Sequence, residues 1–235
     1  MLNIDLQNLG NKRWEGVAGY RVLPGPEGLL PPSAACCGIT LPLEGEGLVE
    51  GVIKGEHDTI EEMALQLLTR RNPTIFPGPL VLWAWRDGVS VKAESVMELA
   101  LEIPGVRIIP MPDYRPIYPK IDPEAVINPC HPNLTIVHNK IEVCVFIGVH
   151  CHFANITLKM IRAGTNCYTI TLCNEAGHED SMASLPFCGT DKVQALTDAI
   201  RRLKANGLQP FHAGSPGIQL TEAQKAVAAN KANGM

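Results

Sequence analysis

The hydrophobic pattern between residues 57 and 205 switches repeatedly between the periods of strands and helices. The runs expected to form strands are Pro79–Trp85, Arg107–Met111, Glu142–Val149 and Cys167–Cys173. Helical spacing marks a stripe that starts at Ile60, a segment around Ala93–Leu101, the segment Phe153–Arg162 and a last helix from Thr190 or Asp191. This alternation predicts a Rossmann-like parallel α/β sheet with right-handed crossovers. Because residues 142–149 are almost continuously apolar, we expect them to form a central strand covered on both faces.

Local signals predict some helix ends. Asp58 followed by Glu61 resembles a capping box, and Pro73 is expected to stop the helix that this box begins. Gly164 is well placed as the C-cap of the helix over residues 153–162.

The chain divides into three parts. Residues 1–56 are rich in glycine and proline and predict an irregular N-terminal arm or a small β appendage, which we expect to dock on another subunit. Residues 57–205 form the predicted Rossmann-like domain. Residues 206–235 have few large apolar groups and predict a peripheral tail. The vicinal pair Cys36-Cys37 lies in the arm, and two small loop residues are its favoured interpretation.

Composition narrows the function classes. The net charge is −4 with no basic run, so we expect no nucleic-acid partner. No apolar stretch reaches the length of a membrane span, and the first residues lack a secretory pattern, so we expect a cytoplasmic protein that does not enter the membrane. Charged residues make up only 19% of the chain, which favours a homo- or hetero-oligomer that buries surface against partners.

The eight cysteines include no CxxC pair, so the commonest zinc and iron–sulfur spacings are absent. A reducing compartment also disfavours disulfides. We therefore expect Cys144, Cys167 and Cys173, which lie in strand-like runs, to be small buried hydrophobic residues.

The segment "VFIGVHCHFANITL" (Val145–Leu158) carries the most distinctive polar cluster. It lies where a predicted strand ends and a helix begins, and ligands bind at such ends in open α/β sheets. Gly148 allows a close backbone approach, and we expect Gly148, His150, His152 and Asn155 to bind a cofactor there.

Three interpretations of His150-Cys151-His152 stay open: a metal site, a catalytic thiol, or a polar rim with neutral histidines. A metal site needs further ligands from His178, Cys188 or Cys130-His131. His178 is also the best candidate base for Cys151, although a solvated loop histidine is the simpler interpretation. We favour the polar rim, with no catalytic residue and no tightly held metal.

The combination "VFIGVHCHFANITLKMIR", a following strand and then "EDSMASLP" resembles the epsilon subunit family of carbon monoxide dehydrogenase/acetyl-CoA synthase. The resemblance covers roughly residues 60–205, and Gly148, His150, Ala154 and Asn155 are its most specific positions. The family has aromatic residues where this chain has Cys151 and His152. The resemblance implies a Rossmann-like domain that leaves the carbon chemistry to metal clusters on a large partner, and fold analogy alone suggests a nucleotide or flavin as cofactor.

Two function classes follow. The first is an accessory, non-catalytic subunit of a multisubunit redox complex in one-carbon or thiol/disulfide metabolism, with iron–sulfur redox proteins among its partners. Its host would be carbon monoxide dehydrogenase-like or heterodisulfide-reductase-like. The second is a stand-alone thiol enzyme or metal-binding protein that uses the region of His150-Cys151-His152.

Overall fold

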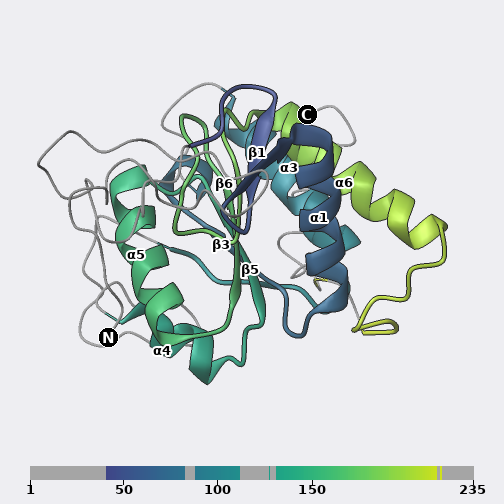
Figure 1. Ribbon diagram of the computed structural model, residues 1–235. Helices are drawn as coiled ribbons and strands as arrows, with labels where there is room; N and C mark the ends of the chain where they lie inside the picture. Colours follow the sequence, from purple (N-terminus) through teal and green to yellow (C-terminus); the bar gives the residue numbers. More distant parts are fainter. Residues whose placement is uncertain (1–40, 83–87, 112–126, 128–130, 216–217, 219–235) are drawn as a thin grey trace, which may run out of the picture.

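One sheet organises the part of the chain that the computed structural model describes, which is residues 41–82, 88–111, 127, 131–215 and 218 (Figure 1). The strand order is β2-β1-β7-β6-β5-β3-β4. The strands are β1 (Glu46–Val49), β2 (Val52–Gly55), β3 (Thr74–Pro77), β4 (Arg107–Ile108), β5 (Val143–Ile147), β6 (Tyr168–Leu172) and β7 (Ala183–Leu185). The helices are α1 (Glu56–Thr69), α2 (Pro79–Leu82), α3 (Val89–Glu102), α4 (Pro132–His138), α5 (Cys151–Gly164) and α6 (Thr190–Ala205).

Five of these strands, β7, β6, β5, β3 and β4, are parallel, and β5 lies in the middle of them. All five residues of β5 are buried. The predicted α/β fold with a central strand in residues 142–149 is therefore confirmed. Two further predicted strands are confirmed with shorter bounds, as β6 and β4.

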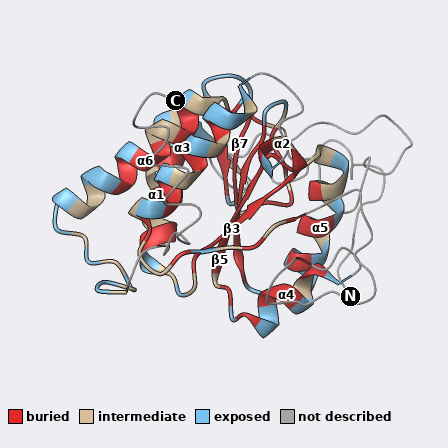
Figure 2. Ribbon diagram, turned by 180° about the vertical axis from the view of Figure 1, so that it is seen from behind, coloured by how far each residue is buried: buried red, intermediate tan, exposed pale blue. Residues whose placement is uncertain are grey.

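Helices cover both faces of the sheet, which gives three layers (Figure 2). On one face α1, α3 and α6 pack on the sheet, and on the other face α4 and α5 do so. The predicted apolar stripe of α1 is confirmed, because Ile60, Met63, Ala64, Leu67 and Leu68 are all buried. The last helix begins at Thr190, as the sequence predicts.

The prediction of a strand over Pro79–Trp85 is wrong for its first four residues, which form the short helix α2; residues 83–85 lie outside the described residues. The strand comes earlier, as β3, and ends at Pro77. At Gly78 the chain leaves β3, and the N–H of Val81 donates to the Gly78 carbonyl in a helical turn. Periodicity does not distinguish a short buried helix from a strand, so the apolar run alone was compatible with both. The proline at position 79 was a signal against a strand that the prediction did not use.

Three predicted helix ends are also wrong. Helix α1 begins at Glu56 after Gly55, so Asp58 lies within its first turn and forms no capping box. The same helix ends at Thr69, before Pro73. Gly164 is the last residue of α5, and Thr165 takes the C-cap position in extended conformation. Helix ends depend on tertiary contacts that sequence signals do not contain.

The strands β1 and β2 form an antiparallel hairpin that extends the sheet from β7. Leu48 pairs with Ser184 of β7 and is fully buried. Residues 46–55 thus belong to the sheet although they precede the predicted domain boundary. The pair Cys36-Cys37 and most of the predicted arm lie outside the described residues. After α6 the chain returns to α1, where the N–H of Phe211 donates to the Leu68 carbonyl.

Candidate functional site: two thiols and an imidazole at the strand ends

The carboxyl ends of β5 and β6 bring two cysteines together. These strands are parallel neighbours, and Ile147 pairs with Leu172 at their last residues. Cys173 follows β6 directly, and Cys151 begins α5 a few residues after β5. Because parallel strands end at one edge of the sheet, both thiols arrive at that edge. Their Sγ atoms lie 3.4 Å apart.

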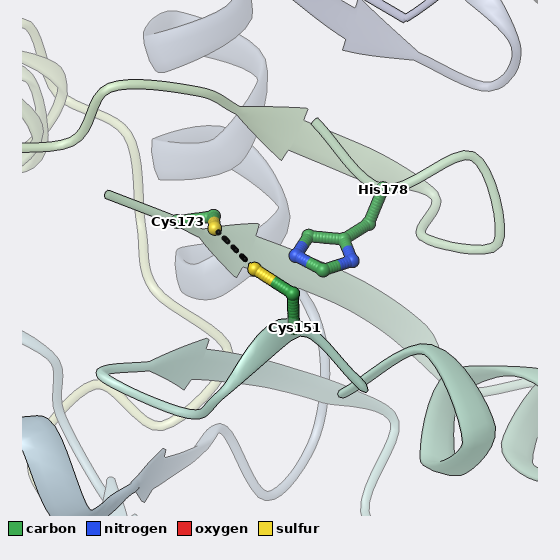
Figure 3. Close-up of side chains that lie close together, drawn as sticks. All are labelled: Cys151, Cys173 and His178. Atoms are coloured by element: carbon green, nitrogen blue, oxygen red, sulfur yellow. Dashed lines mark hydrogen bonds between the residues drawn. The ribbon is translucent and has the colours of Figure 1, made fainter. Parts of the chain in front are cut away.

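His178 completes this cluster (Figure 3). It comes from the loop between β6 and β7, and its ring lies beside the two sulfurs. One ligand atom from each of Cys151, Cys173 and His178 lies within 4.8 Å of the others. Cys173 and His178 are buried, and Cys151 is half-buried. We refer to these three residues as the thiol–imidazole cluster.

Two hydrogen bonds hold His178 in place. Its Nδ1 lies 2.6 Å from Asn155 Oδ1, and Asn155 belongs to the second turn of α5. An amide oxygen only accepts, so Nδ1 donates in this contact, and Nε2 is the ring nitrogen left to interact with the two sulfurs. The backbone N–H of His178 donates to Ser184 Oγ at 2.8 Å. The imidazole is therefore fixed from both its ring and its backbone.

The two thiols have opposite electrostatic environments. Burial raises the pKa of Cys173, but hydrogen bonds from His178 and from the backbone of Ala176 and Glu175 outweigh burial and lower this pKa to about 6. Burial and the neighbouring Cys173 raise the pKa of Cys151 to about 11. Of the two thiols, Cys173 is therefore the one whose surroundings favour the thiolate.

A cleft of about 730 Å³ opens at this edge of the sheet. Cys151 and Cys173 lie in its wall, beside the first residues of α5 and α6. Lys92 of α3 also lines the cleft, and its Nζ donates to the Cys188 carbonyl at 2.8 Å. Burial lowers the pKa of Lys92. Helix N-termini and a buried ammonium group make this cleft suitable for an anionic group.

Gly148 shapes the cleft through a backbone contact. Its φ is +66°, in the left-handed region, and an added Cβ would overlap Val81 of α2. A Cβ on Gly78 would in turn overlap the Gly148 carbonyl. The close approach expected at Gly148 is thus an approach of two chain segments at the ends of β3 and β5.

The predicted cofactor-binding residues separate into two groups. Gly148, His150 and His152 line the cleft, whereas Asn155 bonds to His178. The rings of His150 and His152 are tilted by 41° with centroids 5.9 Å apart, at a helix start and not in an extended segment. Whether these residues bind a cofactor stays a prediction.

The structure also selects among the proposed partners of Cys151. His178 is buried, so its interpretation as a solvated loop histidine is wrong. Cys188 and His131 do not join the cluster, and Cys130 lies outside the described residues. Burial raises the pKa of Cys188 to about 12. Cys144, Cys167 and Cys173 are buried as predicted, but Cys173 also faces a histidine and a second thiol.

Lys92 is a residue of the cleft that the sequence did not reveal, because a lysine within a helix carries no positional signal.

Comparison with known families adds to this geometry. The family model of the CO dehydrogenase beta subunit/acetyl-CoA synthase epsilon subunit matches residues 40–199, more than half of the chain. The chain belongs to this family. The resemblance drawn from "VFIGVHCHFANITLKMIR" is therefore confirmed, and the family match also includes the β1–β2 hairpin. No curated protein matches the chain significantly.

The family match spans every element that builds the cleft. It begins before β1 and ends within α6, so it contains Lys92, Gly148 and the whole thiol–imidazole cluster. Among the described residues, no helix is long and apolar enough to cross a membrane.

Proposed function

We propose that this chain is an accessory, non-catalytic subunit of a multisubunit redox complex that handles one-carbon units or thiols. The observation that carries this proposal is the family match over residues 40–199, because the matched family consists of subunits of CO dehydrogenase/acetyl-CoA synthase. The partners proposed are other protein subunits, including iron–sulfur redox proteins, in the cytoplasm. A heterodisulfide-reductase-like complex is the second host.

The cleft supports a ligand-binding role within such a complex. It lies at the carboxyl ends of the parallel strands, the usual ligand position in this fold, and Gly148, His150 and His152 contribute to its wall. Its charges suit an anionic group of a nucleotide or flavin, with Lys92 and the starts of α5 and α6 as binding groups. We propose that the chain binds and positions this ligand, and that its partner subunits perform the redox chemistry.

Native purification tests the proposal. The untagged protein would be isolated from its own cells under oxygen-free conditions, and mass spectrometry would identify the proteins and small molecules that remain with it. We expect stoichiometric recovery with subunits that hold iron–sulfur clusters. Recovery as an isolated chain that turns over a thiol substrate would contradict the accessory role.

A truncation tests whether the predicted N-terminal arm contributes to association with other subunits. Deleting residues 1–40 removes most of the predicted arm but keeps β1, whose Leu48 is buried against the sheet. We expect this variant to fold and to associate less well than the full chain. Removing residues 1–50 would delete β1 and expose β7, so loss of assembly in that longer truncation would not be informative.

One observation favours a second candidate function. The thiol–imidazole cluster places two cysteines and a histidine within 4.8 Å, beside an open cleft, which suits a thiol enzyme or a metal-binding protein. Activity or metal in the isolated chain, without partner subunits, would support this alternative.

A further inference from the structure

We propose that Cys151, Cys173 and His178 form a binding site for one zinc ion, with three protein ligands and a fourth coordination position open to the cleft. This inference deepens the second candidate function, a metal-binding protein, and it is tested on the isolated chain, so its failure would leave the accessory role standing. Among the residues that the structure describes, these three are the one group of His, Cys, Asp and Glu side chains arranged closely enough to hold a metal.

The donor set suits zinc. Two thiolates and one imidazole are soft to borderline ligands, a combination that zinc binds in tetrahedral geometry. With Zn–S bonds of about 2.3 Å and Zn–N bonds of about 2.0 Å, tetrahedral ligands lie about 3.5–3.8 Å from one another. The observed S–S separation is 3.4 Å, and the three ligand atoms lie within 4.8 Å. Small side-chain rotations would therefore bring all three atoms to bonding distance.

Surrounding hydrogen bonds orient the ligands as metal sites require. The Nδ1–H of His178 donates to Asn155, so Nε2 is the ring nitrogen that can bind a metal in place of its hydrogen bond to Cys173, and Figure 3 shows one ring nitrogen directed toward the sulfurs. The backbone N–H of Glu175 lies 3.5 Å from Cys173 Sγ and stabilises a thiolate there. Cys151 begins α5, where the helix dipole favours negative charge.

The fourth position faces the cleft. Cys151 and Cys173 line the cleft wall, whereas His178 closes the cluster from the protein interior. A structural zinc site normally has four protein ligands, while a site with three keeps a position for water or an exogenous ligand. Two thiolates neutralise the charge of Zn²⁺, and the nearby Lys92 favours an anionic fourth ligand.

A second cysteine pair shows why proximity alone is not sufficient. Cys167 Sγ lies 3.6 Å from Cys144 Sγ, in the layer between the sheet and α5. Both residues are buried among apolar side chains, and within the described part of the chain they belong to no three-residue ligand group. This pair provides a matched control, with the same atoms and a similar spacing.

From the sequence we predicted no tightly held metal, because only two ligands are local in His150-Cys151-His152 and the sequence does not fix the distance to His178 or Cys188. That expectation stays untested, and the geometry favours the opposite outcome through ligands 22 and 27 positions after Cys151 in the chain.

Cobalt titration tests the site directly. The full chain, without a histidine tag, would be reduced, stripped of metal and titrated with Co²⁺ under oxygen-free conditions. We expect one equivalent to bind, with thiolate-to-cobalt charge-transfer absorption and the visible bands of tetrahedral cobalt. One equivalent of Zn²⁺ should displace the cobalt and bleach these bands, because zinc binds tetrahedral thiolate sites more tightly than cobalt does.

Variants distinguish this site from other thiols. The double variant Cys151→Ala/Cys173→Ala should lose the charge-transfer band, and the matched double variant Cys144→Ala/Cys167→Ala should keep it. Asn155→Ala should weaken cobalt affinity about 10- to 100-fold while stoichiometry stays at one, because it removes only the partner of the imidazole.

A measurement on the unchanged protein covers the case in which a variant fails to fold. Zinc should protect Cys151 and Cys173 from alkylation, as read by peptide mass spectrometry. Absence of stoichiometric cobalt binding in the reduced protein would overturn the proposal, as would a band that persists in Cys151→Ala/Cys173→Ala. Isolation as a Cys151–Cys173 disulfide that binds no cobalt after reduction would identify a redox pair in place of a metal site.

Discussion

Replacing Gly148 by alanine separates two reasons why a glycine is needed where β5 ends. The φ of +66° penalises any L-residue by about 1–2 kcal/mol. Reduced freedom of the unfolded chain returns about 0.4–1 kcal/mol, so the net backbone cost is about 1 kcal/mol. An added Cβ also overlaps Val81 Cγ2 and lies 3.0 Å from the Val81 backbone nitrogen. Overpacking of this kind costs about 1–3 kcal/mol, which gives about 2–4 kcal/mol in total.

Gly207 provides the matched control. Its φ is +89°, and no atom of the described residues lies within 4 Å of an added Cβ, so Gly207→Ala should show the backbone cost alone. Urea unfolding followed by circular dichroism would give both free energies of unfolding. We expect Gly148→Ala to lower the free energy by at least about 1 kcal/mol more than Gly207→Ala does.

A double-mutant cycle locates the steric part. Val81→Ala removes the Cγ2 that an alanine at position 148 would overlap, so Gly148→Ala/Val81→Ala should be less destabilised than the sum of its single variants by about 1 kcal/mol or more. Equal costs for Gly148→Ala and Gly207→Ala, or strict additivity in the cycle, would refute the assignment of Gly148 to this close approach.

Three further predictions concern charges and hydrogen bonds in the described fold. Asp180 is buried and lies 2.7 Å from Lys159 and 2.8 Å from Arg162, so Asp180→Asn should cost about 1–3 kcal/mol in the free energy of unfolding, against less than about 0.5 kcal/mol for the exposed Asp198→Asn. Hydrogen bonds chiefly from Lys204 lower the pKa of Glu102. The stabilisation from this carboxylate should therefore be complete above the unfolded pKa of about 4.3 and should disappear as the pH falls through the lower folded value; unfolding curves between pH 3 and 6 should show this slope in the wild type and less of it in Glu102→Gln. Ser184→Ala leaves a buried backbone N–H without its acceptor and should cost about 1–3 kcal/mol, measured by thermal unfolding; an unchanged melting temperature would contradict the role of this hydroxyl.

The core of the sheet could be predicted from the sequence because its strands are buried on both faces. In β5 every residue is apolar and buried, so one run of letters specifies both the element and its position. The same logic failed at Pro79–Leu82, where an apolar run forms a helical turn over the strand ends. A run of four residues is compatible with either structure, and the tertiary contact with Gly148 decides between them.

The candidate site could be predicted only in part. The position of Cys151 at an edge of the sheet could be predicted, because the sequence there shows the end of a strand, then Gly148, then the start of a helix. Cys173 ends a predicted strand that neighbours β5, so the rule that parallel strands end at one edge would have placed the two thiols together. His178 gave no such signal, because its position depends on the path of residues 174–182, which have neither strand nor helix periodicity. Its anchors, Asn155 and Ser184, come from two different elements.

The loop that carries His178 is already fixed by protein contacts, which bears on what a bound zinc ion would do. The N–H of Cys173 donates to the Leu185 carbonyl at 3.1 Å, and Ser181 Oγ donates to the Thr169 carbonyl at 2.9 Å. These bonds need no metal, so we expect metal-free protein to keep the native fold and hydrogen-exchange protection in residues 179–185. Zinc should then raise the melting temperature only by mass action, by an amount that increases with the logarithm of free zinc concentration. Loss of hydrogen-exchange protection throughout residues 174–185 on metal removal would instead show that the metal is needed to fold the loop. A structural zinc ion normally has four protein ligands, so that result would contradict a fourth position open to a ligand.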